Sequence, residues 1–168
     1  MMTLMDLRSE LHYDAGVDNV FAMLCDEAFR TRVCRATGAT DHEVAISRDG
    51  DTAHVRIRRV LPAKVPDFAK KFVGNHIEVV QIEDWGGPEA DGGRRARLRI
   101  EIPGKPGSVD GAVTLSPTGP GSRELVTGDI KVSIPLVGRK LESEVHRGIT
   151  AAMDAEGRVG AAWLAGDR

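Results

Sequence analysis

The sequence predicts an α+β domain in which a curved antiparallel sheet of about seven strands packs against one long C-terminal helix. Three observations carry this prediction. Apolar and polar residues alternate with a period of two in several segments before residue 135, which is typical of half-buried strands. Two short helical patterns follow the first of these segments. From residue 139 the apolar spacing becomes helical and stays so to residue 165.

The beginning of the chain predicts one strand and two short helices. Leu7, Leu11 and Tyr13 alternate with charged residues, as in the first or edge strand of a sheet. The spacing then becomes helical over 17–24. Asp26 can cap a second helix, which ends near residues 37–38.

A hairpin and a series of antiparallel strands follow. The turn 49–50 (Asp-Gly) separates two alternating segments and is a strong hairpin signal. Residues 66–73 predict a short amphipathic helix, because Pro66 suits a first helical turn and Phe68 and Phe72 share a face. Alternating segments predict the remaining strands, at 77–82, 95–102, 109–115 and 126–134.

The last helix has one apolar side. Gly148 lies within this stripe, and a glycine inside a helix costs roughly 1 kcal/mol relative to alanine. We therefore expect either that another part of the fold approaches the helix closely at Gly148, or that Gly148 leaves space for a ligand. Glu142 and His146 lie one turn apart on the flank of the stripe, and we expect them to form a pair at the surface.

Composition argues against several classes of function. Only 4% of the 168 residues are aromatic and the net charge is -2, which suits neither base stacking nor phosphate binding, so we expect no nucleic-acid partner. No apolar run approaches the ~20 residues that span a bilayer, and Asp6 interrupts the N-terminus before a signal-peptide core can form. We expect a cytoplasmic protein, folded as a single domain over residues 1–168, without stable membrane insertion.

Metal or redox chemistry has little support in the sequence. Cys25 and Cys34 belong to no CxxC motif, and the five histidines are scattered singly. We expect free thiols, no metal site and no cofactor.

Three segments resemble a known superfamily. They are 67–74 (DFAKKFVG), 134–138 (IPLVG) and 160–164 (GAAWL). Together with the order of elements, they resemble the START and birch-pollen-allergen-like superfamily, SRPBCC, and within it an uncharacterised domain-of-unknown-function branch of high-GC bacteria. The resemblance spans nearly the whole chain and implies a helix-grip fold, in which the sheet grips the long helix around an apolar cavity. Superfamily members include lipid carriers, hormone receptors and polyketide cyclases, so the fold does not settle the function.

The resemblance also implies which side chains would line such a cavity. They are aliphatic residues on the inner faces of the strands and on the inner stripe of the last helix: Val55, Ile57, Ile77, Val79, Leu98, Ile100, Val113, Ile130, Val145, Ile149 and Ala152. A filled core made of the same side chains is the alternative. The helix that carries Phe68 and Phe72 is either a lid over the cavity mouth or a plain packing helix.

Glu156 is the polar residue that stands out. The helical projection places it in the apolar stripe, where a carboxylate must be paired, hydrogen-bonded or protonated. Arg59 would point inward as its partner if the alternation of the preceding strand continues, whereas a bulge at 60–61 would turn it outward. Alternatively, Glu156 reaches solvent near the end of the helix.

Three functions are compatible with these observations. We favour a non-catalytic binding or carrier protein for an apolar small molecule or lipid, in which Glu156 helps to bind the ligand and no residue is catalytic. The first alternative is a polyketide cyclase or aromatase-like enzyme in which Glu156 moves protons, although the sequence shows it no companion acid, histidine or tyrosine. The second is a protein-interaction module without a cavity. The sequence leaves the ligand and the oligomeric state open.

Overall fold

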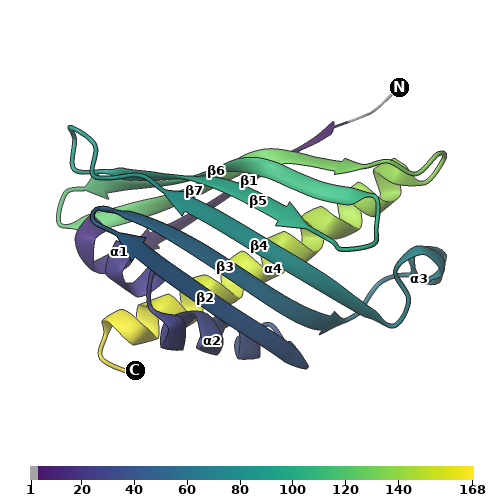
Figure 1. The fold of residues 1–168 in the computed structure, drawn as a ribbon, viewed down its shortest axis with the longest axis horizontal. Helices are drawn as coiled ribbons and strands as arrows, with labels where there is room; N and C mark the ends of the chain where they lie inside the picture. Colours follow the sequence, from purple (N-terminus) through teal and green to yellow (C-terminus); the bar gives the residue numbers. More distant parts are fainter. Residues whose placement is uncertain (1–3) are drawn as a thin grey trace.

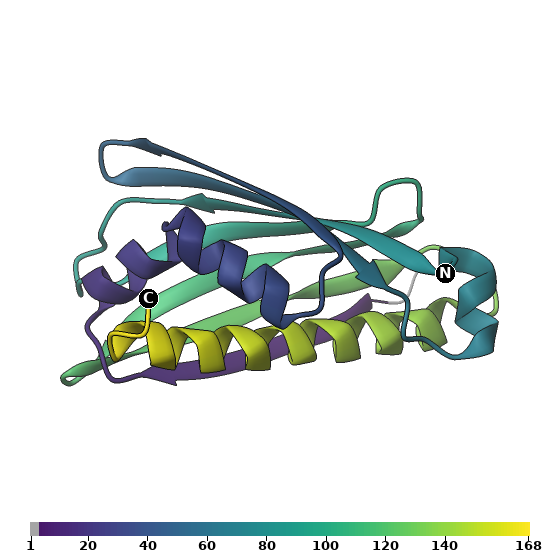
Figure 2. The same cartoon turned by 90° about the horizontal axis from the view of Figure 1, so that it is seen from below.

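The computed structural model describes residues 4–168, which form one antiparallel sheet with helices packed across one of its faces (Figures 1 and 2). Residues 1–3, which belong to the signal-peptide argument above, lie outside the described residues. The elements are β1 (Leu4–Tyr13), α1 (Val17–Leu24), α2 (Glu27–Ala36), β2 (Asp41–Asp49), β3 (Thr52–Pro62), α3 (Asp67–Val73), β4 (His76–Trp85), β5 (Arg94–Glu101), β6 (Gly107–Thr118), β7 (Gly121–Val132) and α4 (Gly138–Leu164).

The seven strands lie in the order β1-β7-β6-β5-β4-β3-β2, so the first strand of the chain pairs with the last. Both edges are open, and β1 is an edge strand as predicted. Gly111 of β6 and Gly128 of β7 face each other in the middle of the sheet. A Cβ atom on Gly111 would lie 1.9 Å from the carbonyl oxygen of Thr127. Only glycine allows this close approach of two backbones, and it helps the sheet to curve.

Most local predictions from the sequence are confirmed. Gly50 has a φ of 58° in the hairpin between β2 and β3. The carboxylate of Asp26 accepts hydrogen bonds from the backbone N–H groups of Ala28 and Phe29, at 2.8 and 3.2 Å, and caps α2. The last strand ends at Val132 rather than at residue 134, because the N–H of residue 133 donates outside the ladder, to the carbonyl of residue 106.

Helix α4 is within one residue of its predicted bounds, but the expected close approach at Gly148 is wrong. Gly148 is exposed, and a Cβ atom there would meet nothing within 4 Å. The close approaches are at Gly157 and Gly160, where a Cβ atom would lie 2.9 Å from Leu11 and 2.7 Å from the ring of Tyr13. The cause is that the C-terminal half of α4 packs directly onto β1.

The expected surface pair of Glu142 and His146 is also wrong. Glu142 is 1% exposed, and its Oε1 accepts a hydrogen bond from the backbone N–H of Val132 at 3.2 Å. The reason is that the first turn of α4 lies against the end of β7, so that a Cβ atom on Gly138 would lie 2.8 Å from the carbonyl oxygen of Val132.

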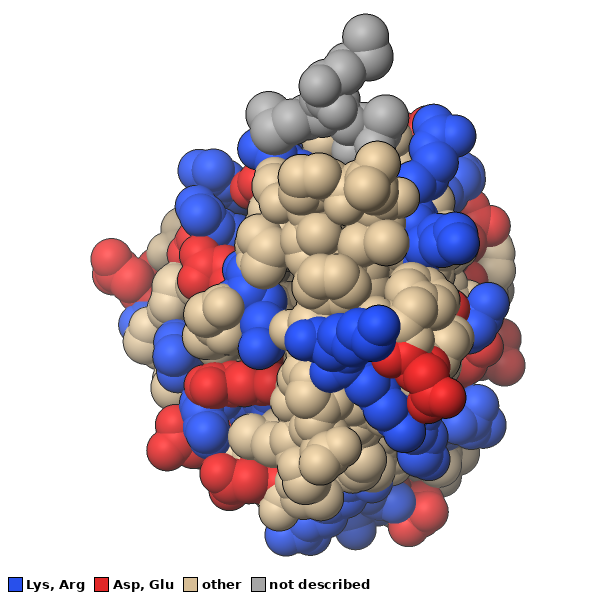
Figure 3. All heavy atoms as spheres, turned by 90° about the vertical axis from the view of Figure 1, so that its right-hand side faces the viewer, with Lys and Arg blue, Asp and Glu red and all other residues tan. Residues whose placement is uncertain are grey.

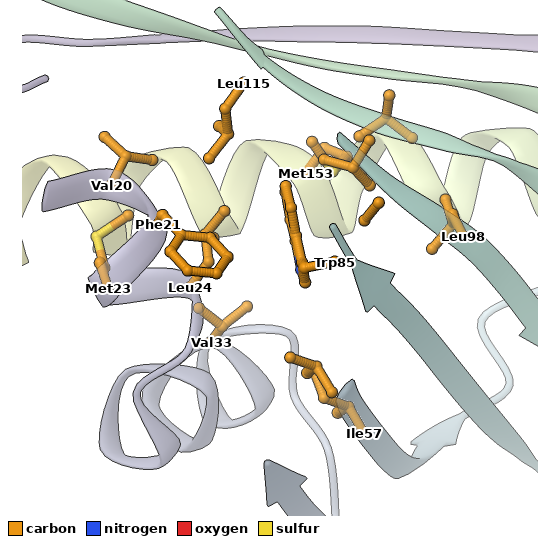
Figure 4. Close-up of a cluster of buried hydrophobic side chains, with 14 of the residues drawn as sticks. Val20, Phe21, Met23, Leu24, Val33, Ile57, Trp85, Leu98, Leu115 and Met153 are labelled. Atoms are coloured by element: carbon orange, nitrogen blue, oxygen red, sulfur yellow. The ribbon is translucent and has the colours of Figure 1, made fainter. Parts of the chain in front are cut away.

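A cluster of buried hydrophobic side chains lies between the sheet, α1 and α2 (Figure 4). Trp85 projects from β4 into this cluster, and its ring meets that of Phe21 edge-on at a centroid distance of 5.5 Å. Met153 reaches the same cluster from α4. In the described chain, no helix has both the length and the hydropathy needed to span a bilayer, and Cys25 and Cys34 are both free thiols.

Candidate functional site

The predicted lining residues form two groups along the inner face of the sheet. Five of them belong to the filled core and are at most 3% exposed: Val55, Ile57, Leu98, Val113 and Ile130. Those toward α3 and the N-terminal half of α4 are half-buried: Ile77, Val79, Ile100, Val145, Ile149 and Ala152. We call this second group the aliphatic wall. The predicted lining is therefore partly filled core and partly accessible to solvent.

Helix α3 lies at one end of the molecule (Figures 1 and 2). It connects β3 to β4, and Ala69 is its buried residue, whereas Phe68 and Phe72 are half-buried. The ammonium nitrogen of Lys140, in the first turn of α4, lies 5.6 Å from the ring centroid of Phe68. This contact joins α3 to the start of α4.

A buried polar cluster lies at the inner end of the aliphatic wall, with Arg30 of α2 at its centre. Arg30 is 2% exposed, and its Nη2 donates to Oε1 of Glu83 on β4 at 2.8 Å. Its Nε donates to the carbonyl of Leu24 at 2.7 Å, and its Nη1 lies 3.7 Å from Oε2 of Glu156 on α4. Burial alone would lower the pKa of Arg30, but Glu83 and Glu156 raise it above its ordinary value, so the guanidinium stays charged.

Glu83 is held by several donors. Besides Arg30, the indole N–H of Trp85 donates to its Oε1 at 2.9 Å, and the side-chain amide of Gln81 donates to its Oε2 at 2.5 Å. A carboxylate with this many donors is a stable partner for a buried cation.

A third carboxyl group, Glu124 of β7, is 3% exposed and interacts with Glu156. Burial and then the charge of Glu156 raise the pKa of Glu124 well above its ordinary value. Burial also raises the pKa of Glu156, against the opposing effect of Arg30. The hydroxyl of Tyr13 donates to Oε2 of Glu124 at 3.4 Å, and burial followed by the charge of Glu124 raises the pKa of Tyr13. Two carboxyls this close favour keeping one proton between them.

Arg59 of β3 extends the polar cluster toward the aliphatic wall. It is 6% exposed and points inward, so the strand alternation continues and no bulge turns it outward. Its Nη2 donates to Oε1 of Gln81 at 3.2 Å. Among the described residues, Nε of Arg59 and Oε1 of Glu156 are buried polar atoms without a hydrogen-bond partner. A donor and an acceptor are thus left free in the interior.

The structure places Glu156 in the interior, but it gives it different companions from those the sequence suggests. Arg30, rather than Arg59, forms its ion pair. Arg30, Glu83 and Glu124 are functional candidates that the predictions from the sequence did not include. The alternation of the strands could have indicated Glu83 and Glu124, because both lie at inward-facing positions. Glu83 pairs with Val55 across the sheet, and Glu124 pairs with Leu115. Nothing in the local sequence marks Arg30.

Two of the hollows at the surface of the described chain lie away from the aliphatic wall. One lies beside the hairpin between β2 and β3 and includes Arg48, His54 and Asp84. The other lies between α1 and the C-terminal end of α4 and includes Asn19 and Trp163. Neither is lined by a residue of the aliphatic wall, so ligand binding at the predicted residues stays a prediction. No group of three or more His, Cys, Asp or Glu side chains within residues 4–168 is placed to hold a metal ion.

The curved sheet, the two short helices after its first strand and the long C-terminal helix across its inner face define a helix-grip fold of the START-like kind. Residues 8–164 match the family described as "Protein of unknown function (DUF2505)", and the chain belongs to this family. Among curated proteins, none matches the sequence.

Solved structures share this fold at low sequence identity. TTHA0849 from Thermus thermophilus is 20% identical, with a TM-score of 0.65 over 95% of this chain and 99% of that one. The Zhui aromatase/cyclase from Streptomyces sp. R1128 is 13% identical, with a TM-score of 0.62 over 99% and 100%. The lipid transfer and protein localization domain of human StarD13 is 16% identical, with a TM-score of 0.60 over 94% and 77%.

Proposed function

We propose that this protein is a non-catalytic, cytoplasmic carrier that binds an apolar small molecule or lipid between the sheet and α4. The observation that carries the proposal is the polarity of the interior. The aliphatic wall is half-buried at the α3 end and leads to the buried polar cluster, where Arg59 and Glu156 each have an unpartnered atom. An amphipathic molecule with one polar end matches this arrangement.

The aliphatic wall would supply most of the affinity. Each half-buried side chain that a ligand covers loses contact with water, and full burial of a side chain of this size contributes about 1.5 to 3 kcal/mol. The polar cluster would fix the orientation of the ligand. A buried donor or acceptor without a partner is costly, so a ligand that supplies the missing hydrogen bonds is favoured over one that does not. Among proteins of the same fold, StarD13 contains a lipid transfer domain, which is consistent with such cargo.

Helix α3 would cover the entrance. Phe68 and Phe72 are half-buried, and the contact between Phe68 and Lys140 closes α3 onto the start of α4. A short connecting helix with one buried residue can move at modest cost, as lids commonly do.

Titration with cis-parinaric acid, a fluorescent polyene fatty acid, tests the carrier function. We expect saturable binding by the parent protein. Ile149→Gln places a polar group on the aliphatic wall and should weaken binding by about tenfold or more, since it removes a contact of about 1.5 kcal/mol or more. Val159→Gln is the matched control, because Val159 is also a half-buried apolar residue of α4 but packs near the C-terminal end.

Two results would contradict the carrier function. One is the absence of saturable fluorescence enhancement in a parent protein that is folded by circular dichroism. The other is an equal loss of binding in the Ile149 and Val159 variants, which would mean that the probe does not occupy the aliphatic wall.

An enzymatic function is the second candidate, and the polar cluster favours it. Glu156 has the companions that the sequence did not show, because Glu124 and Tyr13 lie beside it and one carboxyl can hold a proton. A protonated carboxyl can act as a general acid. The Zhui protein, which shares the fold, is an aromatase/cyclase.

Incubation with a linear poly-β-ketone, followed by mass spectrometry, distinguishes this candidate from a carrier. Cyclisation and aromatisation release water, so an enzyme would convert the chain to a lighter product. Glu156→Gln should then abolish conversion while the ligand still binds. If the parent leaves the chain unchanged, or if the variant converts it at the parental rate, Glu156 is not a catalytic acid.

A further inference from the structure

The lysines of this protein are gathered at one end of the molecule. The chain has six lysines, and they lie in the connection from β3, in α3, in the turn between β5 and β6, at the end of β7 and in the first turn of α4: Lys64, Lys70, Lys71, Lys105, Lys131 and Lys140. These segments all lie at the α3 end, on the right in Figure 1. The loops of the opposite end carry exposed acids, among them Asp14, Asp49, Asp51, Glu89 and Asp91. The lysines are therefore confined to one end of the long axis.

The lysine charges are not neutralised by ion pairs. Within residues 4–168 no lysine forms a salt bridge, whereas two acids of the same end are paired with arginines. Glu78 binds Arg58 and Glu101 binds Arg99, both at 2.7 Å. Asp67 at the start of α3, and Asp110 and Asp129, which face each other on β6 and β7, are described acids of this end outside any ion pair. The α3 end thus presents lysine ammonium groups that no ion pair neutralises.

Exposed leucines lie among these lysines. Of the described residues, the two exposed large apolar side chains are Leu136, which is fully exposed, and Leu4, which is 57% exposed. Leu4 pairs with Lys131 in the sheet, and Leu136 lies in the turn before α4. In Figure 3, which faces this end, a band of uncharged atoms has Lys and Arg side chains on both sides and across it, with Asp and Glu side chains among them.

The backbone conformation that exposes Leu136 is strained. Its φ is 70°, a left-handed conformation that side chains other than glycine and asparagine rarely adopt. Two backbone hydrogen bonds fix the turn, from Val137 to Pro135 and from Gly138 to Ile134, each 2.9 Å long. A strained and fully exposed leucine gives no benefit to the folded chain alone, so its benefit should come from a contact outside the protein.

We propose that the α3 end docks reversibly on a membrane surface that contains anionic lipids, with Leu136 inserted among the acyl chains and the lysines above the headgroups. Lysines beside a bilayer attract anionic lipids, and one or two apolar side chains add a modest insertion. Lysine is depleted in protein–protein interfaces, which makes a partner protein a poorer match for this surface. The proposal rests on the carrier function, because a bilayer is where such a protein would collect or deliver an apolar cargo through the α3 end.

Co-sedimentation with vesicles tests the docking. We expect the protein to bind phosphatidylcholine vesicles that contain phosphatidylglycerol, not to bind vesicles of phosphatidylcholine alone, and to be released by salt. Lys70→Glu/Lys71→Glu should weaken binding by at least about twentyfold, taking about fivefold for each charge. Arg95→Glu/Arg97→Glu is the matched control, because it changes the net charge equally on exposed positions of β5.

Leu136→Asn tests the apolar part of the contact. Asparagine tolerates the left-handed conformation, so the fold is retained, and binding should fall severalfold through the loss of the inserted side chain. The docking is wrong if the parent does not bind the anionic vesicles. It is also wrong if the lysine and arginine variants lose binding equally, because the attraction would then come from net charge alone.

Binding of cis-parinaric acid without vesicles separates this proposal from the carrier function. The Leu136→Asn variant should bind the probe as well as the parent does, because Leu136 is fully exposed and is not part of the aliphatic wall. A protein that binds the probe but no vesicles refutes the docking and leaves the carrier function intact. A protein that binds anionic vesicles through the lysines but never the probe refutes the carrier function and retains the docking surface.

Discussion

Replacing Arg30 with methionine should destabilise the protein strongly. The substitution keeps a long apolar side chain in α2 but removes the cation that binds Glu83 and faces Glu156. Both carboxyls are nearly inaccessible to water, with side chains 3% and 8% exposed, so solvent cannot replace the lost partner. The variant leaves buried negative charge without compensation.

The size of the effect follows from the contacts of Arg30. Its two short hydrogen bonds, to Glu83 at 2.8 Å and to the carbonyl of Leu24 at 2.7 Å, each involve a charged donor and contribute about 1.5 to 3 kcal/mol. Removing one member of a buried ion pair costs about 3 to 5 kcal/mol in other proteins. We therefore expect the free energy of unfolding to fall by about 3 to 5 kcal/mol.

Urea denaturation, followed by the fluorescence of Trp85 and Trp163, measures this change. The midpoint should fall while the slope stays constant, because the surface exposed on unfolding is unchanged. Arg30→Met/Glu83→Gln removes the unpaired charge on Glu83, and its loss of stability should be smaller than the sum of the two single losses. A loss below about 1 kcal/mol for Arg30→Met, or strict additivity in the cycle, would show that the ion pair does not hold α2 to the sheet.

Three further predictions concern proton binding, helix packing and ligand orientation. The raised pKa of Glu124 means that the folded state keeps a proton that the unfolded chain has already lost, so this residue's contribution to stability falls as the pH rises toward the folded-state pKa. Glu124→Gln should therefore stabilise the protein, and increasingly so at higher pH; urea midpoints that shift equally at all pH values would contradict this. Gly148→Ala should raise the unfolding free energy by about 1 kcal/mol, because the site is open and alanine favours the helix. Gly160→Ala should lower it by about 1 kcal/mol, because the new methyl group meets the ring of Tyr13; thermal melts that rank the two variants in the reverse order would refute the packing of α4. Arg59→Met should weaken the binding of cis-parinaric acid but not of its methyl ester, and an equal effect on the two probes would show that Arg59 does not contact the carboxylate.

The sequence predicts the architecture well because the deciding signals are local. The turn at Gly50, the cap at Asp26 and the change of period before α4 each lie within a few residues, and the structure has all of them. Periodicity also indicates which strand residues face inward. It places Val55 and Ile57 in the interior, and its continuation correctly turns Arg59 inward.

The companions of Glu156 could not be predicted in the same way. Arg30, Glu83 and Glu124 come from α2, β4 and β7, and only the folded chain brings them together. A single helical stripe also describes α4 poorly, because the helix packs against β1, β7 and α2 on different faces. For this reason the sequence misplaces Glu142 at the surface and expects the close approach at Gly148 instead of at Gly160.

The central claim is that an apolar ligand occupies the space between the sheet and α4. Native mass spectrometry of the protein purified from its own cells tests this claim most directly, because it needs no assumption about the ligand. We expect a second species heavier than the bare chain, whose added mass is released on denaturation as a lipid-like molecule and is reduced in Ile149→Gln but not in Val159→Gln. A spectrum with the bare chain alone, from protein that also fails to take up cis-parinaric acid, would contradict this claim.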